Sequence, residues 1–103
     1  MNKEIDDAHE LMPPDMQDRI PRLRQTEDVQ DPMVLLKWFT PDSSWTWFVL
    51  EFDPSDETCF GLVDGLEREL GHFSIGEIKR LRGPLGLPVE RDLHWRPKRV
   101  SEC

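Results

Sequence analysis

The sequence predicts an α+β domain: a small, mostly antiparallel β-sheet with one principal helix at about residues 75–82 and a short N-terminal helix. Three observations predict this fold. Two runs of aliphatic and aromatic residues, beginning at Met33 and Trp45, are typical of strands. The Asp-Gly pair at 64–65 is a strong hairpin signal, and Ser-Ile-Gly-Glu at 74–77 has the pattern of a capping box that opens a helix. A chain of 103 residues fits one compact domain.

The first part of the chain is rich in acidic residues and proline. Residues 1–31 carry nine acidic and four basic side chains. We expect residues 1–12 to be a flexible acidic N-terminal extension and residues 13–103 to form the single domain. Pro14 suits a first helical turn and Pro21 stops a helix, so a short helix is expected between them.

The middle of the chain supplies most of the sheet. The first run predicts a strand from Met33 to about Phe39, and a second strand follows at residues 45–52 after a turn. Both faces of the second strand are largely apolar, so we expect it to be a central strand that is covered on both sides. The composition of residues 53–57 is typical of a turn. The remaining strands are expected at residues 59–63, 67–73 and 89–95.

The principal helix has the clearest local signals. Ser74 is a favourable N-cap, and Ile75, Ile78 and Leu81 fall on one helical face. Gly-Pro at 83–84 ends the helix, because neither residue continues it well.

The chain is acidic, and its charge is unevenly distributed. It carries 21 acidic and 13 basic side chains, for a net charge of -8. Residues 1–31 sum to -5, residues 32–78 to -7 and residues 79–103 to +4. This polarity favours binding of another macromolecule through charged surfaces. The candidate acidic contact residues are Glu51, Asp53, Asp56, Glu57, Asp64 and Glu67. The candidate basic contact residues are Arg91, Trp95, Arg96, Lys98 and Arg99, although a solvated helix face followed by a frayed tail is the simpler explanation of this end.

No residue pattern indicates catalysis or a bound cofactor. The three histidines and two cysteines lack the spacing of a zinc site, and we interpret both cysteines as free thiols. We therefore predict a protein without enzymatic activity, metal or cofactor. One alternative is a small metal-assisted hydrolase that uses strand carboxylates. Its residues would be Glu51 and Asp53, with Glu90 or Asp92 and with Arg91 to stabilise developing charge.

Several ordered motifs resemble one known family. They are Lys-Trp-Phe-Thr-Pro-Asp-Ser-Ser-Trp-Thr-Trp at 37–47, Glu-Phe-Asp-Pro at 51–54, Phe-Gly-Leu-Val at 60–63, Glu-Leu-Gly-His-Phe-Ser at 69–74 and Arg-Gly-Pro-Leu-Gly-Leu-Pro-Val-Glu-Arg-Asp at 82–92. Over residues 11–102 the chain resembles the family called domain of unknown function 2958. The chain departs from that family's pattern at His72 and Arg24, where the family often has tyrosine, and at Ile75, where it commonly has leucine.

The resemblance implies a genetic setting. The family is similar to small proteins of plasmids, integrative elements and phages, and compact acidic proteins of such elements often block host defences. We therefore expect a non-enzymatic interaction protein that inhibits or modulates a host nucleic-acid-handling complex, as an anti-CRISPR or anti-restriction protein does, for instance by DNA mimicry.

The expected role also implies a class of partner and a cellular location. The expected partner is a host protein or ribonucleoprotein complex, and we expect neither membrane contact nor direct binding of nucleic acid. The absence of a leader and of a long apolar stretch favours the cytoplasm. A second alternative is a minor nucleic-acid binder that acts through the C-terminal basic segment.

Overall fold

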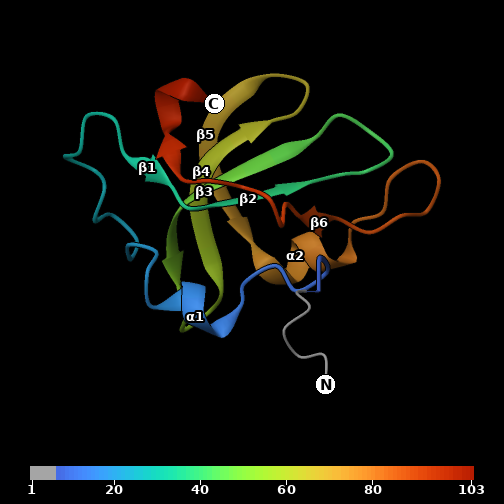
Figure 1. The fold of residues 1–103 in the computed structure, drawn as a ribbon, viewed down its shortest axis with the longest axis horizontal. Coiled ribbons are helices and arrows are strands. Elements are labelled where there is room, and N and C mark those ends of the chain that lie inside the picture. Colours follow the sequence, from blue (N-terminus) through green and yellow to red (C-terminus); the bar gives the residue numbers. More distant parts are fainter. Residues whose placement is uncertain (1–6) are drawn as a thin grey trace.

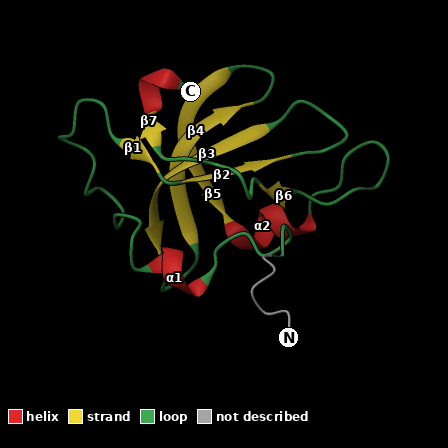
Figure 2. Ribbon diagram, viewed as in Figure 1, coloured by secondary structure: helices red, strands yellow, loops and turns green. Residues whose placement is uncertain are grey.

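The computed structural model describes residues 7–103 (Figures 1 and 2). The predicted α+β class is confirmed, because the described chain forms mostly antiparallel β-sheets and two short α-helices. In chain order the elements are α1 (Pro14–Gln17), β1 (Met33–Val34), β2 (Leu36–Phe39), β3 (Thr46–Asp53), β4 (Thr58–Asp64), β5 (Arg68–Ser74), α2 (Ile75–Arg80), β6 (Glu90–Arg91), β7 (Lys98–Arg99) and the 3-10 helix η2 (Val100–Glu102). None of the helices described is long and apolar enough to cross a bilayer.

The main sheet has five strands in the order β5-β4-β3-β2-β6, and all neighbouring strands are antiparallel. β3 is the central strand, as its two apolar faces predict, and every residue between its terminal ones is buried. A second, two-stranded sheet pairs β1 with β7. The C-terminal segment therefore returns to lie beside β1 (Figure 2).

Two apolar clusters lie on opposite faces of the main sheet. The larger cluster contains Trp47, Val49 and Phe52 of β3. It is covered by α2 and the N-terminal segment, through Leu11, Met12, Ile20, Ile75 and Ile78. The smaller cluster contains Phe48 and Leu50. It is covered by the C-terminal segment, through Trp95, Val100 and Cys103.

A β-bulge in β3 changes which side chains share a face. The register against β4 shifts between Val49 and Glu51. Strict alternation would place Leu50 and Phe52 on one face, but Leu50 packs in the smaller cluster and Phe52 in the larger. Glu51 pairs with Phe60, which packs against the smaller cluster. The bulge therefore moves Glu51 to the face opposite the one that alternation from Val49 predicts.

Gly61 and Gly71 are cross-strand partners in β4 and β5, but only Gly71 has room for a side chain. A Cβ on Gly61 would lie 2.0 Å from the Phe48 carbonyl oxygen, whereas a Cβ on Gly71 would meet nothing within 4 Å. We expect Gly61→Ala to lower the free energy of unfolding by about 2 kcal/mol, because the central strands must move apart. We expect Gly71→Ala to change it by less than about 0.5 kcal/mol. Urea unfolding of both variants measures the difference, and equal losses would contradict this packing.

Part of the predicted N-terminal extension packs onto the sheet. Leu11 is 1% exposed and Met12 is 8% exposed. The Trp38 indole Nε1 donates a hydrogen bond of 2.8 Å to the Leu11 carbonyl oxygen. Because these apolar residues cover Trp38, the packed part of the chain begins before the predicted boundary at residue 12. Residues 1–6 of the predicted extension lie outside the described residues.

The principal helix begins where its capping box predicts. The Ser74 hydroxyl accepts a hydrogen bond of 3.0 Å from the Glu77 N–H. The helix ends at Arg80, two residues before the predicted end, because Leu81 adopts an extended backbone. A bridge between Arg82 and Pro88 then closes the following loop.

The last predicted strand, at residues 89–95, is much shorter than expected. Only Glu90–Arg91 pairs with β2. The Asp92 N–H donates to the Lys37 carbonyl oxygen at 2.9 Å, and the Asp92 carboxylate accepts from the His94 N–H at 3.0 Å. The first bond still joins Asp92 to β2, and the second belongs to the turn at residues 93–94 in which the chain leaves the sheet.

Candidate interaction surface

A buried carboxylate fixes the loop before β1 to the sheet. Glu51 is 3% exposed. It accepts hydrogen bonds from the backbone N–H of Arg24 at 2.7 Å and of Thr26 at 2.9 Å, and the Thr26 hydroxyl donates another. Arg24 has a φ of 74°, so the chain turns sharply between the two donating N–H groups. Glu51 therefore holds residues 24–26 over the face of the smaller cluster.

The same contacts set the ionisation of Glu51. Burial acts to raise the pKa of this carboxyl, but hydrogen bonds from the Thr26 hydroxyl and from the Arg24 and Thr26 amides outweigh it. The charge of His72 acts in the same direction as the hydrogen bonds. The pKa of Glu51 therefore lies below its ordinary value of 4.5. At neutral pH Glu51 is a charged group with both oxygens occupied.

The anchored loop forms one wall of a groove whose other wall is β5. The groove has a volume of about 380 Å³. Its apolar lining comes from Val29, Leu50, Phe60, Leu70 and Val100. Leu70 is 56% exposed and Val29 is 48% exposed, so the groove opens to solvent between two apolar rims.

The hydrogen bonds at the two ends of the β4–β5 ladder fix which backbone groups of β5 face β4. The Ile75 N–H donates to the Glu57 carbonyl oxygen at 3.0 Å, and the Gly65 N–H donates to the Glu67 carbonyl oxygen at 3.1 Å. Hydrogen-bonded pairs alternate along an antiparallel ladder. The odd-numbered residues of β5 are therefore the ones that hydrogen-bond to β4.

The other edge of β5 presents backbone groups that are not paired. β5 is an outer strand of the sheet, so the N–H and C=O groups of Arg68, Leu70 and His72 point away from β4. No backbone or side-chain group of residues 7–103 forms a hydrogen bond with them. All three residues are exposed. β5 is thus an open strand edge of the kind that can accept another strand.

A second groove, of about 530 Å³, runs beside the hairpin end of β5. Trp45, Val63, Leu66 and Leu70 supply its apolar lining, and Glu67 and Glu69 supply its carboxylates. Leu66 is 93% exposed and Trp45 is 37% exposed. Neither carboxylate forms an ion pair within the described part of the chain. This groove therefore combines exposed apolar area with unneutralised negative charge.

Comparison with known proteins identifies the family. Residues 11–102 match the model of the family described as Protein of unknown function (DUF2958). The chain belongs to this family. The match covers the same residues as the resemblance drawn from the motifs, which is thereby confirmed. No curated protein and no solved structure matches the chain.

Two of the motifs that carry the likeness touch each other in this DUF2958 protein. The Asp42 carboxylate accepts a hydrogen bond from the Leu85 N–H at 2.8 Å and a longer one from the Leu87 N–H at 3.4 Å. A Cβ on Gly83 would lie 1.6 Å from Asp42 Oδ1. Asp42 therefore holds the Gly-Pro loop after α2, and a side chain at position 83 would displace the Asp42 carboxylate from this loop.

The acidic residues predicted to act together are separated in the DUF2958 protein. Glu51 is buried beneath residues 24–26 and is not on the surface. The other five lie near the two hairpin turns at the opposite ends of β4, which Figure 1 shows. Asp53 ends β3 beside Asp56 and Glu57 in one turn, and Asp64 ends β4 beside Glu67 in the other. The fold therefore presents two acidic turns instead of one continuous acidic surface.

Several of these carboxylates stabilise their own turns. Asp53 accepts hydrogen bonds from the Ser55 hydroxyl and N–H, which lower its pKa. Asp56 accepts from the Thr58 N–H at 3.1 Å. Asp64 forms an ion pair of 2.8 Å with Arg68.

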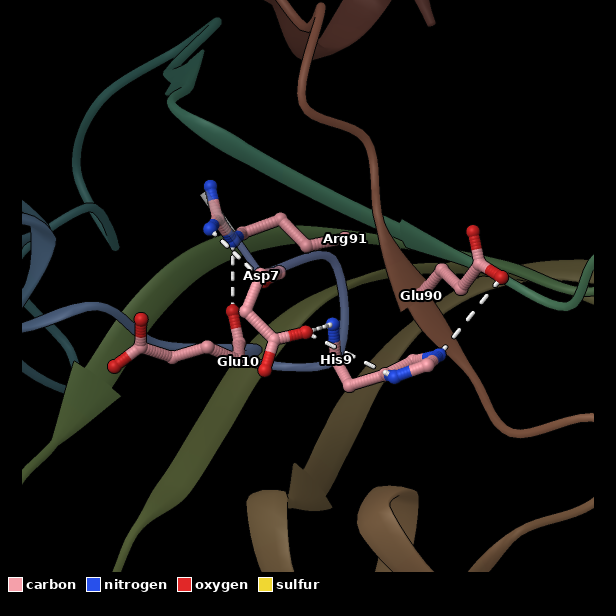
Figure 3. A network of polar contacts seen from close by, with 5 residues as sticks. All are labelled: Asp7, His9, Glu10, Glu90 and Arg91. Carbon is pink, nitrogen blue, oxygen red and sulfur yellow. Dashed lines mark hydrogen bonds and ion pairs between the residues drawn. The ribbon is translucent and has the colours of Figure 1, made fainter. Parts of the chain in front are cut away.

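At the predicted basic end, Arg91 lies inside the fold and not on its surface. Arg91 is 8% exposed, and its guanidinium donates to the carbonyl oxygens of Glu10 at 2.7 Å and Asp7 at 3.3 Å (Figure 3). The His9 ring lies 3.9 Å from the Glu90 carboxylate in the same network. Arg91 therefore ties β6 to the N-terminal segment.

Trp95 anchors the C-terminal segment to the sheet. Its ring packs 5.8 Å from the Phe48 ring, and its indole donates to the Val34 carbonyl oxygen at 3.0 Å. The Nζ atoms of Lys98 and Lys37 lie 4.9 Å and 5.5 Å from the centroid of its ring. Trp95 is half-buried, so its predicted role as a contact residue competes with this internal packing.

The three remaining basic contact candidates, Arg96, Lys98 and Arg99, are exposed. The Arg99 guanidinium donates to the Asp31 carbonyl oxygen at 2.9 Å. The Ser101 N–H and hydroxyl also donate to the Asp31 carboxylate. The C-terminal segment is therefore held against the chain by specific bonds and is not the frayed tail that the sequence suggested.

The residues of the hydrolase alternative lie in separate places. Both oxygens of Glu51 are occupied by residues 24–26, and Glu90 and Asp92 lie at the β6 edge, two strands from β3. Within the part of the chain that the structure describes, no three histidine, cysteine or carboxylate side chains are placed to hold a metal ion. Cys59 and Cys103 are free thiols, as predicted. Burial, assisted by the charge of Glu57, raises the pKa of Cys59 to about 12.

Of the surface around β5, the sequence predicts only Glu67 as a contact residue. The apolar members of this surface, Leu66 and Leu70, flank the charged tripeptide Glu-Arg-Glu at 67–69. Leucines in a charged hairpin were the available signal, because such residues have no buried face to occupy. The open edge itself could not be found, since the order of strands is not encoded locally.

Proposed function

We propose that this DUF2958 protein is a non-enzymatic interaction protein of a mobile genetic element that inhibits or modulates a host complex that handles nucleic acids. One observation carries the proposal: Leu66, Leu70 and Trp45 are exposed together around β5. The same chain buries Trp38 and Trp47 almost completely. An apolar patch framed by charged residues is typical of a surface that binds another protein.

The surplus negative charge supports a partner that is itself basic. A net charge of -8 steers the molecule toward positively charged surfaces, which proteins that handle nucleic acids expose. An anti-CRISPR or anti-restriction activity by DNA mimicry would use the two acidic turns together, because β4 separates them by about 20 Å. The partner is then a host protein or ribonucleoprotein complex.

Affinity capture from a host lysate, followed by mass spectrometry, tests this function. We expect the wild-type protein to retain a defined host protein or ribonucleoprotein, and Leu66→Ser with Leu70→Ser to lose at least nine-tenths of it. Both leucines are more than half exposed, so the double variant should fold normally. Leu93→Ser, beyond the opposite edge of the sheet, is the matched control, because Leu93 is 41% exposed.

Salt and charge reversal test the electrostatic part of the proposal. Retention is expected to fall as ionic strength rises. Glu57→Lys should weaken retention while leaving Asp53 and Asp56 to hold the turn. Retention that is unchanged in the leucine variant and in Glu57→Lys would overturn the proposed function.

A further inference from the structure

We propose that the outer edge of β5 binds an extended segment of the partner as an additional sheet strand, and that this segment alternates apolar and basic side chains. The inference rests on the proposed function, because it names the mode of binding and the chemistry of the partner. Strand addition of this kind takes affinity from main-chain hydrogen bonds and specificity from alternate side chains.

The backbone of β5 supplies the hydrogen bonds. Arg68, Leu70 and His72 each direct one N–H and one C=O group outward, and no group among residues 7–103 satisfies them. An antiparallel segment of five or more residues would satisfy all of these groups at once. The edge carries no bulge and no proline to prevent such pairing.

One face of the added strand would contact mainly apolar surface, beside the Arg68 side chain that pairs with Asp64. Leu70 and His72 are cross-strand partners of Leu62 and Phe60, so their side chains lie on the face of the smaller cluster. The centroids of the His72 and Phe60 rings are 4.9 Å apart. The 380 Å³ groove begins at these side chains, with Val29 on its far rim. Aliphatic side chains of the added strand would lie in this groove.

The other face would contact negative charge. Glu69 is the cross-strand partner of Val63, which packs against the larger cluster, so it lies on the opposite face from Leu70. Glu67 and Glu69 have no cationic partner in the part of the chain described. Gly71 leaves open space beside Glu69. Lysine or arginine opposite these positions would neutralise both carboxylates and extend toward the exposed Trp45 ring.

This charge pattern favours a different partner chain over a second copy of this one. If two β5 strands paired about a two-fold axis, equivalent faces would be continuous across the junction. Glu67 and Glu69 of both copies would then lie on one face, between two molecules that each carry a charge of -8. A basic segment removes that repulsion.

Binding of synthetic peptides to the full chain tests the proposal. The probe is a capped octapeptide of alternating lysine and valine, compared with a glutamate-valine octapeptide and with a block peptide of four lysines followed by four valines. We expect the alternating lysine peptide to bind at least tenfold more tightly than either control. Its binding should slow hydrogen exchange at the amides of Arg68, Leu70 and His72 by at least tenfold.

Leu70→Pro is the decisive variant, because it removes an outward N–H without removing a hydrogen bond to β4. We expect it to reduce peptide affinity at least tenfold with an unchanged circular dichroism spectrum. If that variant fails to fold, Glu67→Lys with Glu69→Lys serves instead, and it should reverse the preference between the lysine-valine and glutamate-valine peptides.

Three results would overturn strand addition. They are equal binding of the block and alternating peptides, protection of amides elsewhere than at β5, and a concentration-dependent dimer that Leu70→Pro abolishes. Host capture that still depends on Leu66 and Leu70, together with any of these results, would leave the proposed function standing while this inference fails. If host capture no longer depends on Leu66 and Leu70 and the alternating peptide does not bind, the β5 surface binds no partner.

Discussion

Replacing Trp38 by alanine is expected to lower the free energy of unfolding by about 4 kcal/mol. Trp38 is 0% exposed, packs edge to face against Phe73 with centroids 5.8 Å apart, and donates its indole hydrogen to the Leu11 carbonyl oxygen. Alanine would leave a large cavity and an unsatisfied carbonyl at the junction of the sheet with the N-terminal segment. Urea unfolding followed by circular dichroism measures the loss.

Two further variants separate the causes of this loss. Trp38→Phe keeps most of the ring volume but removes the hydrogen bond to Leu11, so it should cost less, about 2 kcal/mol. Trp45→Ala removes a ring that is 37% exposed and should cost about 1 kcal/mol. Equal costs for Trp38→Ala and Trp45→Ala would mean that residues 11 and 12 do not cover the sheet as described.

Glu51→Ala is expected to cost about 3 kcal/mol, because it leaves the Arg24 and Thr26 amides and the Thr26 hydroxyl without their acceptor. Glu51→Gln keeps the shape but replaces one accepting oxygen with a donor, so about 2 kcal/mol should be lost. Chemical denaturation at neutral pH measures both variants. Glu69→Gln, at an exposed position, is the control and should change stability by less than about 0.5 kcal/mol.

The contribution of Glu51 should depend on pH in a defined direction. Its folded-state pKa is lowered below 4.5, so the folded protein binds a proton at Glu51 less readily than the unfolded chain does. The stabilisation is therefore complete above the unfolded pKa and disappears as pH falls through the folded one. The stability difference between wild type and Glu51→Gln should shrink on acidification below about pH 4. A difference that grows in acid would contradict the hydrogen bonding of Glu51.

The alanine variants of Trp38 and Glu51 distinguish the stability of the fold from the shape of the interaction surface. Glu51 holds residues 24–26, and those residues form one wall of the groove beside β5. Loss of Glu51 should therefore release that wall in addition to lowering stability. Trp38 lies on the other face of the sheet, so its loss should lower stability without altering the groove.

Much of the candidate surface was beyond prediction from the sequence. The sequence predicts that Glu51 is a surface carboxylate and that Arg91 belongs to a basic surface. Both are buried and bonded to segments far along the chain, at residues 24–26 and at residues 7–10. Charged residues carry no local sign of such partners, because the partners come from unrelated parts of the sequence.

The sequence by itself determined the α+β class, the family, the central position of β3, the N-cap at Ser74 and the free state of both cysteines. These features follow from periodicity, capping and composition, which act over a few neighbouring residues. Only the tertiary structure decided that a bulge turns Glu51 toward the loop, that Leu11 covers Trp38 and that β5 has an unpaired edge. Those outcomes depend on which distant strands and loops meet, and long-range pairing is a property of the whole chain.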